Sequence, residues 1–255
     1  MTRFSIITVC LNEAETIRGT CESICSQSFQ GFEWIVIDGC STDGTLDVLS
    51  EYEHRIDHLI SEADAGLYDA MNKGLRLAKG KYLLFLNAGD SLVGAQVLDV
   101  VSKVPDVDLI YGDLCCISED NATFVKVFPD VLSKYYLLKQ MMPHQASFIR
   151  RTLFDKYGDY DTSLKIAADY DLFVRFLYIH RISYIHVPQT LAVFVTDGLS
   201  SRADQRELRK NENHLVRKKY FPWFVYGLKG LKMQFRQPCK VNNVQTYNPN
   251  KSVRI

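Results

Sequence analysis

Three kinds of feature are scarce in this sequence of 255 residues. The 30 Lys and Arg residues are balanced by 30 Asp and Glu residues, so the chain has no net charge and lacks the general electrostatic signature of a nucleic-acid-binding protein. No apolar run approaches the roughly 18 residues of a membrane-spanning helix. The N-terminal stretch MTRFSIITVCLNEAE contains neither the long apolar region nor the cleavage site of a signal peptide. We therefore expect a cytoplasmic protein, soluble or peripheral on a membrane, without a nucleic-acid partner.

Paired cysteines are also missing. The seven cysteines are odd in number, form no CxxC pair, and several stand in apolar surroundings, where a small buried thiol is common. We interpret them as reduced and mostly structural, which again favours the cytoplasm. They are Cys10, Cys21, Cys25, Cys40, Cys115, Cys116 and Cys239.

Glycine-rich phosphate-binding loops are absent as well. No GxGxxG follows a predicted strand, which argues against a Rossmann oxidoreductase. A nucleotidyltransferase would need a glycine-rich, arginine-containing loop after the first strand, but the segment 8–13, TVCLNE, has no glycine. An EF-hand calcium loop starting at Asp38 is excluded too, because Cys40 and Thr42 stand where acids or amides are required.

What the sequence does contain is a regular alternation of strand and helix patterns in its first hundred residues. Continuous apolar runs predict strands at 4–9, 32–37, 58–61 and 82–86, and amphipathic spacing predicts helices at 17–24, 45–52, 68–77 and 95–102. Such alternation predicts an α/β fold with a mainly parallel central sheet and helices on both faces. Ligands of these sheets bind outside the carboxyl ends of the strands.

The rest of the chain has a more mixed pattern. Strands are predicted at 109–111, 123–127, 146–149, 183–187 and 191–195, and helices at 131–139 and 167–178. From Arg202 a basic helical stretch with aromatic residues begins, which suits either a helix on an anionic membrane surface or one packed on the main domain. We predict a main domain at 1–200, a basic and aromatic helical extension at 201–238, and a disordered tail at 239–255.

Polar residues gather where the predicted parallel strands end. Thr8, Asn12 and Glu13 accompany the end of the first strand, and Asp38 ends the second. The segment 62–69 follows the third strand, and 87–90, NAGD, follows the fourth. Because the carboxyl ends of parallel strands meet at one edge of a sheet, these side chains are predicted to surround a shared crevice.

The order of four short motifs resembles that of family 2 glycosyltransferases with the GT-A fold. The motifs are FSIITV at 4–9, VIDGCSTDGT at 36–45, NAGD at 87–90 and ADYD at 168–171. The segments DAGLYDAMNKG at 64–74, PHQ at 143–145 and KIAADY at 165–170 further resemble bacterial enzymes that build colanic acid and similar exopolysaccharides. The resemblance covers about the first 200 residues and implies the GT-A fold.

The resemblance also implies where the donor is bound. Asp38 would accept a hydrogen bond from the base of a nucleotide sugar, and the nucleotide pocket would include Thr8, Asn12 and Glu13. The donor-sugar side would include Asp64, Tyr68, Asp69 and Asn72, of which Asp69 and Asn72 share a helix face. From the residues alone, the alternatives are that Asp38 only caps a turn into the helix at Thr45 and that Asn72 supports the core.

The resemblance implies a divalent metal and a catalytic base too. Asp90 looks like the last acid of a DxD-type motif that binds Mn²⁺ or Mg²⁺ and the diphosphate. Asn87 and Gly89 stand where acids are frequent in the family, which predicts a weaker metal site. Asn87 could bind ribose or a water ligand, and His144 could bind metal or phosphate or be structural, while Gln145 accompanies it on the donor side.

Asp169 matches the acid that acts as general base in the family, with Ala168 in the place of a frequent Glu. Asp171 is its competitor, but two positions further along a helix it points about 200° away, so both cannot face one sugar. Either acid could also serve only to complement the helix dipole.

Together with these residues, the resemblance implies an inverting glycosyltransferase of the hexosyltransferase type. Its donor is expected to be a UDP-sugar and its acceptor a saccharide. The resemblance implies that this saccharide is linked to a lipid and that the reaction belongs to bacterial surface polysaccharide synthesis. The alternative is a catalytically silent partner that binds a sugar nucleotide within a polysaccharide assembly complex.

Overall fold

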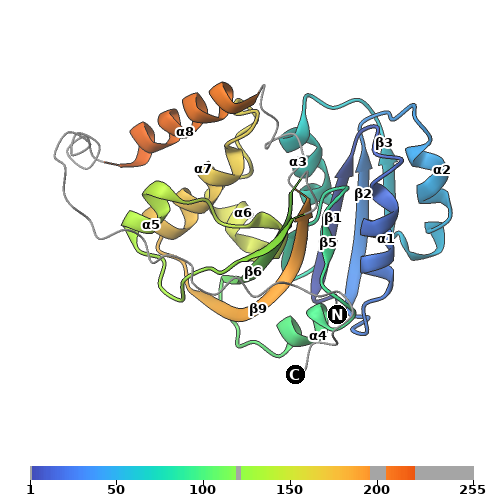
Figure 1. The fold of residues 1–255 in the computed structure, drawn as a ribbon, viewed down its shortest axis with the longest axis horizontal. Helices are drawn as coiled ribbons and strands as arrows, with labels where there is room; N and C mark the ends of the chain where they lie inside the picture. The colour runs from blue at the N-terminus through green and yellow to red at the C-terminus, as the bar shows by residue number, and fades with distance from the viewer. Residues whose placement is uncertain (1, 119–121, 196–204, 222–255) are drawn as a thin grey trace.

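The structure is a computed structural model that describes residues 2–118, 122–195 and 205–221. Within these residues nine strands form one sheet of order β3-β2-β1-β4-β8-β6-β9-β5, with β7 paired to β6 (Figure 1). The strands are β1 Phe4–Cys10, β2 Phe32–Asp38, β3 His58–Ser61, β4 Tyr82–Phe85, β5 Ser91–Leu92, β6 Leu109–Ile117, β7 Thr123–Lys126, β8 Ser147–Arg150 and β9 Tyr184–Val195.

The first four strands form a parallel half-sheet, as the sequence predicts. Strand β1 pairs in parallel with both β2 and β4, and β2 with β3, while every residue of β1 is buried. Helix α3 (Leu67–Leu77) packs on β1 and β2. It can approach closely because Gly74 faces the sheet, where a Cβ would lie only 2.4 Å from Cγ2 of Ile7. Helix α1 (Ile17–Cys25) lies beside α2 (Thr45–Ser50), which a single 3₁₀ turn at Glu53–Arg55 follows.

The second half of the sheet is mixed. Strand β8 is antiparallel to β4 and β6, β9 is parallel to β6, and β5 is antiparallel to β9. The two strands predicted at 183–187 and 191–195 are one strand, β9, whose register against β6 shifts on either side of Asp113. A bulge of this kind lets one strand continue through an irregular stretch, and so the predicted break is only a local irregularity.

The helices of this half are α4 Val97–Ser102, α5 Lys134–Lys139, α6 Thr152–Tyr157, α7 Ala168–Val174 and α8 Arg206–Tyr220, with a 3₁₀ turn at His144–Ala146 and a π-helical turn at Arg175–Ile179. Among them, α7 and the 3₁₀ turn carry predicted site residues. Helix α8 lies across the same end of the molecule as α7 (Figure 1). It falls within the predicted extension 201–238, while the predicted tail 239–255 lies outside the described residues. Among the described helices, none is both long and apolar enough to cross a membrane.

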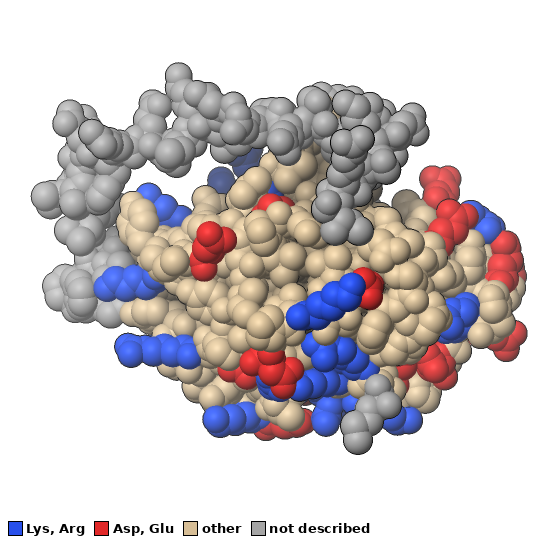
Figure 2. Space-filling view, turned by 90° about the horizontal axis from the view of Figure 1, so that it is seen from below, with Lys and Arg blue, Asp and Glu red and all other residues tan. Residues whose placement is uncertain are grey.

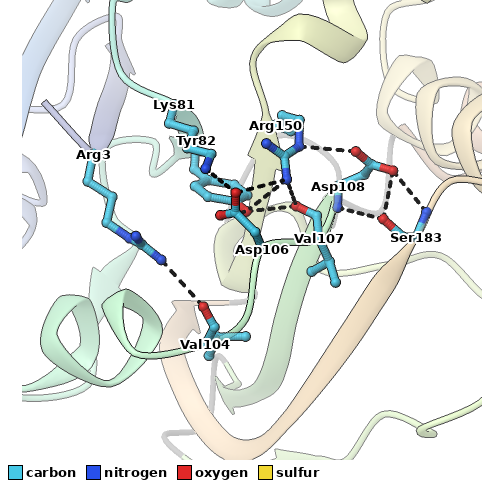
Figure 3. Close-up of polar contacts among 9 residues, drawn as sticks. All are labelled: Arg3, Lys81, Tyr82, Val104, Asp106, Val107, Asp108, Arg150 and Ser183. Carbon is cyan, nitrogen blue, oxygen red and sulfur yellow. Dashed lines mark hydrogen bonds and ion pairs between the residues drawn. The ribbon is translucent and has the colours of Figure 1, made fainter. Parts of the chain in front are cut away.

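A polar network ties the strands together at the end of the sheet opposite the carboxyl ends of the parallel strands β1, β2 and β4. Arg150 of β8 donates from Nε to Oδ1 of Asp108 at 3.0 Å and from Nη2 to the carbonyl of Val107 at 2.8 Å (Figure 3). Asp108 in turn accepts from the backbone and hydroxyl of Ser183, which precedes β9. Figure 2 shows this end of the molecule with basic and acidic side chains beside one another. The network fixes the second half-sheet and leaves the other end for the site.

Candidate active site

The loops that follow β1 and β2 are held together by reciprocal hydrogen bonds. The backbone N–H of Asn12 donates to Oγ of Ser41 at 2.8 Å, and Oδ1 of Asn12 accepts from the Thr42 N–H at 2.9 Å. The Glu13 N–H donates to Oγ1 of Thr45 at 2.8 Å. Asn12 has φ +56°, a left-handed conformation that Asn tolerates better than most residues. Both predicted nucleotide residues are therefore part of a preformed double loop.

Asp38 ends β2 beneath this double loop and is fully buried. Its Oδ2 accepts from the Ser41 N–H at 3.0 Å and from the Ser61 hydroxyl at 2.6 Å, whereas Oδ1 is contacted by the Cys10 thiol at 3.6 Å. Burial opposes the charged form, but the hydrogen bonds from Ser41 and Ser61 outweigh it and hold the pKa of Asp38 below its usual value. Asp38 thus stays ionised and caps the turn. Its Oδ1 atom has only the weak contact with the Cys10 thiol.

Two further predicted residues near this loop differ in exposure. Thr8 is fully buried, and its hydroxyl accepts from Nε1 of Trp34 at 3.0 Å. The Glu13 carboxylate instead accepts from the Thr16 hydroxyl at 2.5 Å on the exposed side of the loop. Of the two, only Glu13 is placed to meet a ligand without rearrangement, and the contact of Thr8 with a nucleotide stays a prediction.

The predicted donor-sugar residues of 64–72 are divided between the crevice and the core. Asp64 accepts from the Gly66 N–H at 2.8 Å, and its Oδ2 lies 2.7 Å from the position that a Cβ on Gly39 would take. Asp64 is therefore next to the end of β2. Asp69 accepts from the Ala65 N–H at 3.1 Å and so closes the same short loop.

Tyr68 and Asn72 point into the protein instead. The Asn72 amide donates to the Tyr160 carbonyl at 2.9 Å and accepts from the Tyr160 N–H at 3.1 Å, so both of its functional groups are occupied. Tyr68 stacks on the Tyr160 ring with centroids 5.5 Å apart. A donor sugar would have to compete with these contacts to reach Asn72, and Tyr160 is a residue that the sequence pattern did not single out.

Asp90 and its neighbours form the second part of the candidate site. Asp90 is buried, and the Thr20 hydroxyl of α1 donates to its carbonyl at 2.7 Å, which fixes the turn 87–90. Burial raises the pKa of Asp90 to about 7; nearby His144 and a hydrogen bond from Gln145 oppose the rise, and the charge of Glu13 adds to it. The structure therefore brings together four predicted residues from three distant segments.

Asp169 lies at the first turn of α7 and is 3% exposed. Its Oδ1 accepts from the N–H of Tyr170 at 2.7 Å and lies 3.3 Å from the Tyr68 hydroxyl, which donates more closely to the Ile166 carbonyl at 2.7 Å. Its Oδ2 lies 3.4 Å from Nδ1 of His144. Burial, followed by the charge of Asp169, raises the pKa of Tyr68 well above its usual value, so its hydroxyl stays protonated and can donate.

Asp171 faces a different part of the protein, as the helix geometry predicts. Its Oδ1 accepts from Nζ of Lys219 at 2.9 Å, and its Oδ2 lies 3.4 Å from Nε of Arg175. Only 1% of Asp171 is exposed. A carboxylate that is buried between two cations holds helices together, so Asp169 is the acid of this motif that remains next to the crevice.

Glu212 is a buried acid that the sequence pattern did not reveal. It belongs to α8, and its two oxygens accept from the backbone N–H groups of Lys165, Ile166 and Ala167 at 2.8 to 2.9 Å. Helix α7 has no side-chain cap of its own, because Ala167 occupies the N-cap position. A carboxylate from another helix thus performs the capping. The sequence contains no local signal for it, because donors and acceptor lie far apart in the chain.

The donor atoms near Asp90 suit a divalent metal that also binds phosphate oxygens. Nε2 of His144 and Oδ1 of Asn87 are both buried and have no hydrogen-bond partner among the described residues. Together with the Asp90 carboxylate they form an oxygen and imidazole donor set, which Mn²⁺ accepts. The described residues contain no cluster of three His, Cys, Asp or Glu that could hold a metal alone, so ligands from a substrate would be needed.

Comparison with known proteins identifies the family. Residues 5–158 match the model of Glycosyl transferase family 2. A PGL/p-HBAD biosynthesis glycosyltransferase of Mycobacterium bovis is 38% identical over 179 residues, 68% of each chain. An uncharacterized glycosyltransferase of Haemophilus influenzae is 28% identical over 81% of this chain and 73% of its own. The chain therefore belongs to glycosyltransferase family 2, while the finer resemblance to colanic acid enzymes stays a prediction.

Solved structures confirm the fold. The S. aureus TarS 1-349 complex with UDP-GlcNAc has a TM-score of 0.66 at 18% identity, covering 86% of this chain and 68% of that one. A mannosyltransferase from Pyrobaculum calidifontis in complex with GDP-Man and Mn²⁺ has a TM-score of 0.61 at 18% identity, covering 90% and 65%. The predicted GT-A fold is confirmed, with a parallel first half and a mixed second half of the sheet.

Proposed function

We propose that this protein is an inverting glycosyltransferase that moves a sugar from a nucleotide diphosphate donor, a UDP-sugar, to a hydroxyl of a saccharide. The observation that carries the proposal is the juxtaposition of Asp90, His144 and Asp169 at the carboxyl end of the parallel half-sheet. Family membership and the nucleotide-sugar complexes of two structural neighbours support the donor class.

The geometry suits a single displacement. The acceptor oxygen forms a bond to the anomeric carbon, the bond from that carbon to the diphosphate breaks, and Asp169 takes the hydroxyl proton. The Tyr170 N–H and the Tyr68 hydroxyl hold Oδ1 of Asp169 in place, which leaves Oδ2 as the atom nearer His144. Attack opposite to the leaving group inverts the anomeric configuration.

The other end of the crevice would receive the leaving nucleotide. Asp90, with Asn87 and His144, would hold Mn²⁺ or Mg²⁺, which would neutralise charge on the departing diphosphate. The double loop of Asn12 and Glu13 would surround the base and ribose, and Asp38, which is fully buried in this structure, would offer Oδ1 to the base only after a local rearrangement.

Nucleotide release from a panel of UDP- and GDP-sugars, with water as the default acceptor, tests the proposal. We expect release from one donor, and Asp169→Asn to lower the rate by at least about a hundredfold, because general-base catalysis contributes that much or more. The exposed Asp159→Asn is the matched control and should keep the wild-type rate. Wild-type turnover in Asp169→Asn would contradict the base assignment, and nucleotide binding without any release would favour the silent-partner alternative.

We further propose that the acceptor is lipid-linked and that the protein contacts the cytoplasmic face of a bacterial membrane. The support is the row of exposed cations on α8, Arg206, Lys210 and Lys218. Sedimentation with anionic vesicles should recover the protein at low salt, with loss of binding in Lys210→Glu/Lys218→Glu, because each cation near an anionic surface contributes about 1 kcal/mol. Equal recovery with neutral vesicles would contradict an electrostatic contact.

A further inference from the structure

A pocket of about 190 Å³ lies between α5, α7, α8 and the end of β9. It is smaller than the roughly 300–1,000 Å³ of most small-molecule sites, so it suits one group of a larger ligand. The described residues that line it are Lys139, Gln140, Met141, Ile166, Tyr170, Phe194, Arg209, Asn213 and Arg217.

The charge of this lining has one sign. It includes three cations, Lys139, Arg209 and Arg217, and none of the described lining residues is acidic. Glu212, the neighbour of Asn213 in α8, has both oxygens occupied by backbone N–H groups. Three cations thus line the pocket, and two of them are guanidinium groups. Such a lining suits an anion with more than one charge, and phosphate is the common group of that kind.

The remaining lining residues are mixed: Met141, Ile166, Tyr170 and Phe194 are largely apolar, whereas Gln140 and Asn213 are polar. The Tyr170 hydroxyl donates to the Leu137 carbonyl at 2.8 Å, and Nε of Arg217 donates to the Leu138 carbonyl at 2.9 Å. The Arg217 guanidinium also lies 5.6 Å from the centroid of the Tyr170 ring. Leu138 uses only one of the five N–H donors of a guanidinium. A cationic group is thus held beside apolar side chains, Met141 and Phe194 among them, before any ligand binds.

The pocket shares its wall with the proposed base. Tyr170 follows Asp169 directly and donates its N–H to Oδ1 of that acid, and the Ile166 carbonyl accepts from Tyr68 next to the same oxygen. A ligand in the pocket would therefore lie on the α7 and α8 side of Asp169, whereas Asp90 and His144 lie towards the sheet.

We propose that this pocket binds the phosphate of an amphiphilic acceptor and the first apolar atoms attached to it. The inference rests on the proposed function, since it assigns the acceptor of that reaction to a chemical class. The cations bind the phosphate, the apolar side chains contact the chain beyond it, and the adjoining sugar hydroxyl is presented to Asp169.

Decyl phosphate below its micelle-forming concentration is the probe. After UDP binding has been measured separately for each preparation, decyl phosphate is titrated calorimetrically in excess UDP and Mg²⁺, so that the nucleotide site is already filled. We expect Arg209→Gln and Lys139→Gln each to weaken its binding at least fivefold and to leave UDP binding within twofold. Lys134→Gln, an exposed cation of α5 that does not line the pocket, is the matched control for Lys139→Gln and should bind as the wild type does.

Two other ligands show whether the pocket requires both the phosphate and the apolar chain. Inorganic phosphate and the neutral decyl maltoside should each bind at least tenfold more weakly than decyl phosphate. Equal affinity for either of them, or equal decyl phosphate affinity in all variants, would overturn the proposal. Undetectable decyl phosphate binding with intact UDP binding would overturn this pocket alone, whereas loss of UDP binding in the wild type would contradict the proposed function.

Discussion

At the scale of single residues, His144 links two carboxylates that come from distant parts of the chain. Its Nδ1 lies 3.4 Å from Oδ2 of Asp169, and its proximity is the main influence that opposes the raised pKa of Asp90. An acid kept in a buried site with an elevated pKa is costly for folding, which is typical of functional sites. The imidazole of His144 therefore lies near both Asp90, on the proposed donor side, and Asp169, the proposed base on the acceptor side.

Gly39→Ala is expected to weaken binding of the nucleotide sugar. The new Cβ would lie 2.7 Å from Oδ2 of Asp64, and because that atom ends a side chain, Asp64 would move rather than the backbone. We expect about a fivefold to tenfold loss of donor affinity, or ~1 kcal/mol, in a titration. Gly19→Ala is the control: nothing lies within 4 Å of its Cβ, so the helix should gain about 0.5–1 kcal/mol without any change in affinity. Unchanged donor affinity in Gly39→Ala would contradict a role for Asp64.

The sequence predicts the location of several of these residues in the fold, but it does not predict which residues they contact. The periodicity of the 168–171 segment separates Asp169 from Asp171, and the structure confirms that they face different neighbours. For Asp38 the turn-capping interpretation is confirmed by its hydrogen bond from Ser41, while its contact with a base stays a prediction. The pairing of Asn72 with the Tyr160 backbone could not be foreseen, because it joins segments with no sequence relation.

At the scale of elements, α8 organises the helix that bears the proposed base. Glu212 caps the N-terminus of α7, and Lys219 of α8 pairs with Asp171 one turn further on. Arg217 also reaches the carbonyl of Leu138 at the end of α5. One side of α8 thus fixes α7 and α5, while the exposed cations remain on another side of the helix.

Glu212→Gln is expected to lower turnover without affecting the nucleotide. The amide has one acceptor oxygen fewer and directs N–H groups at backbone donors, which should cost about 1–3 kcal/mol of unfolding free energy. Because Asp169 lies directly after this cap, we also expect kcat for donor turnover to fall more than tenfold while the Kd for UDP changes less than twofold. Thermal unfolding and steady-state kinetics measure both effects.

Glu207→Gln is the matched control, since Glu207 is an exposed acid of α8 that pairs with Lys210. It should retain the kcat and the unfolding midpoint of the wild type. A kcat for Glu212→Gln equal to that of the wild type, at a temperature where both proteins are folded, would show that Glu212 only stabilises the protein.

Element prediction succeeds where the pattern is local. Strand β3 and the parallel strands β1, β2 and β4 agree with the predicted ranges to within one residue at each end, because their apolar runs are bounded by polar residues. Helix α6 and the two-residue strand β5 are too short for a periodic signal and were not predicted. The π-helical turn that ends the predicted helix 167–178 likewise has no sequence signal.

At the scale of the whole molecule, the contacts that stabilise the sheet and the residues of the candidate site lie at opposite ends of the sheet. The network of Arg150, Asp108 and Ser183 binds the second half-sheet at one end (Figure 3), and the loops after β1, β2 and β4 carry predicted site residues at the other. The alternation of strands and helices predicted the parallel half and its ligand-binding edge. The antiparallel β8 could not be predicted, because strand direction depends on partners that are far away in the sequence.

The most direct test of the account is a titration of the purified protein with UDP, GDP and CDP, each with Mn²⁺ and with chelator. The account predicts metal-dependent binding of UDP, and loss of the Mn²⁺ effect in Asp90→Ala, because Asp90 would supply the charged protein ligand of the metal. Equal UDP affinity with and without Mn²⁺ in both proteins would contradict the metal site. Binding of none of the three nucleotides under either condition would contradict the central claim that this crevice receives a nucleotide sugar.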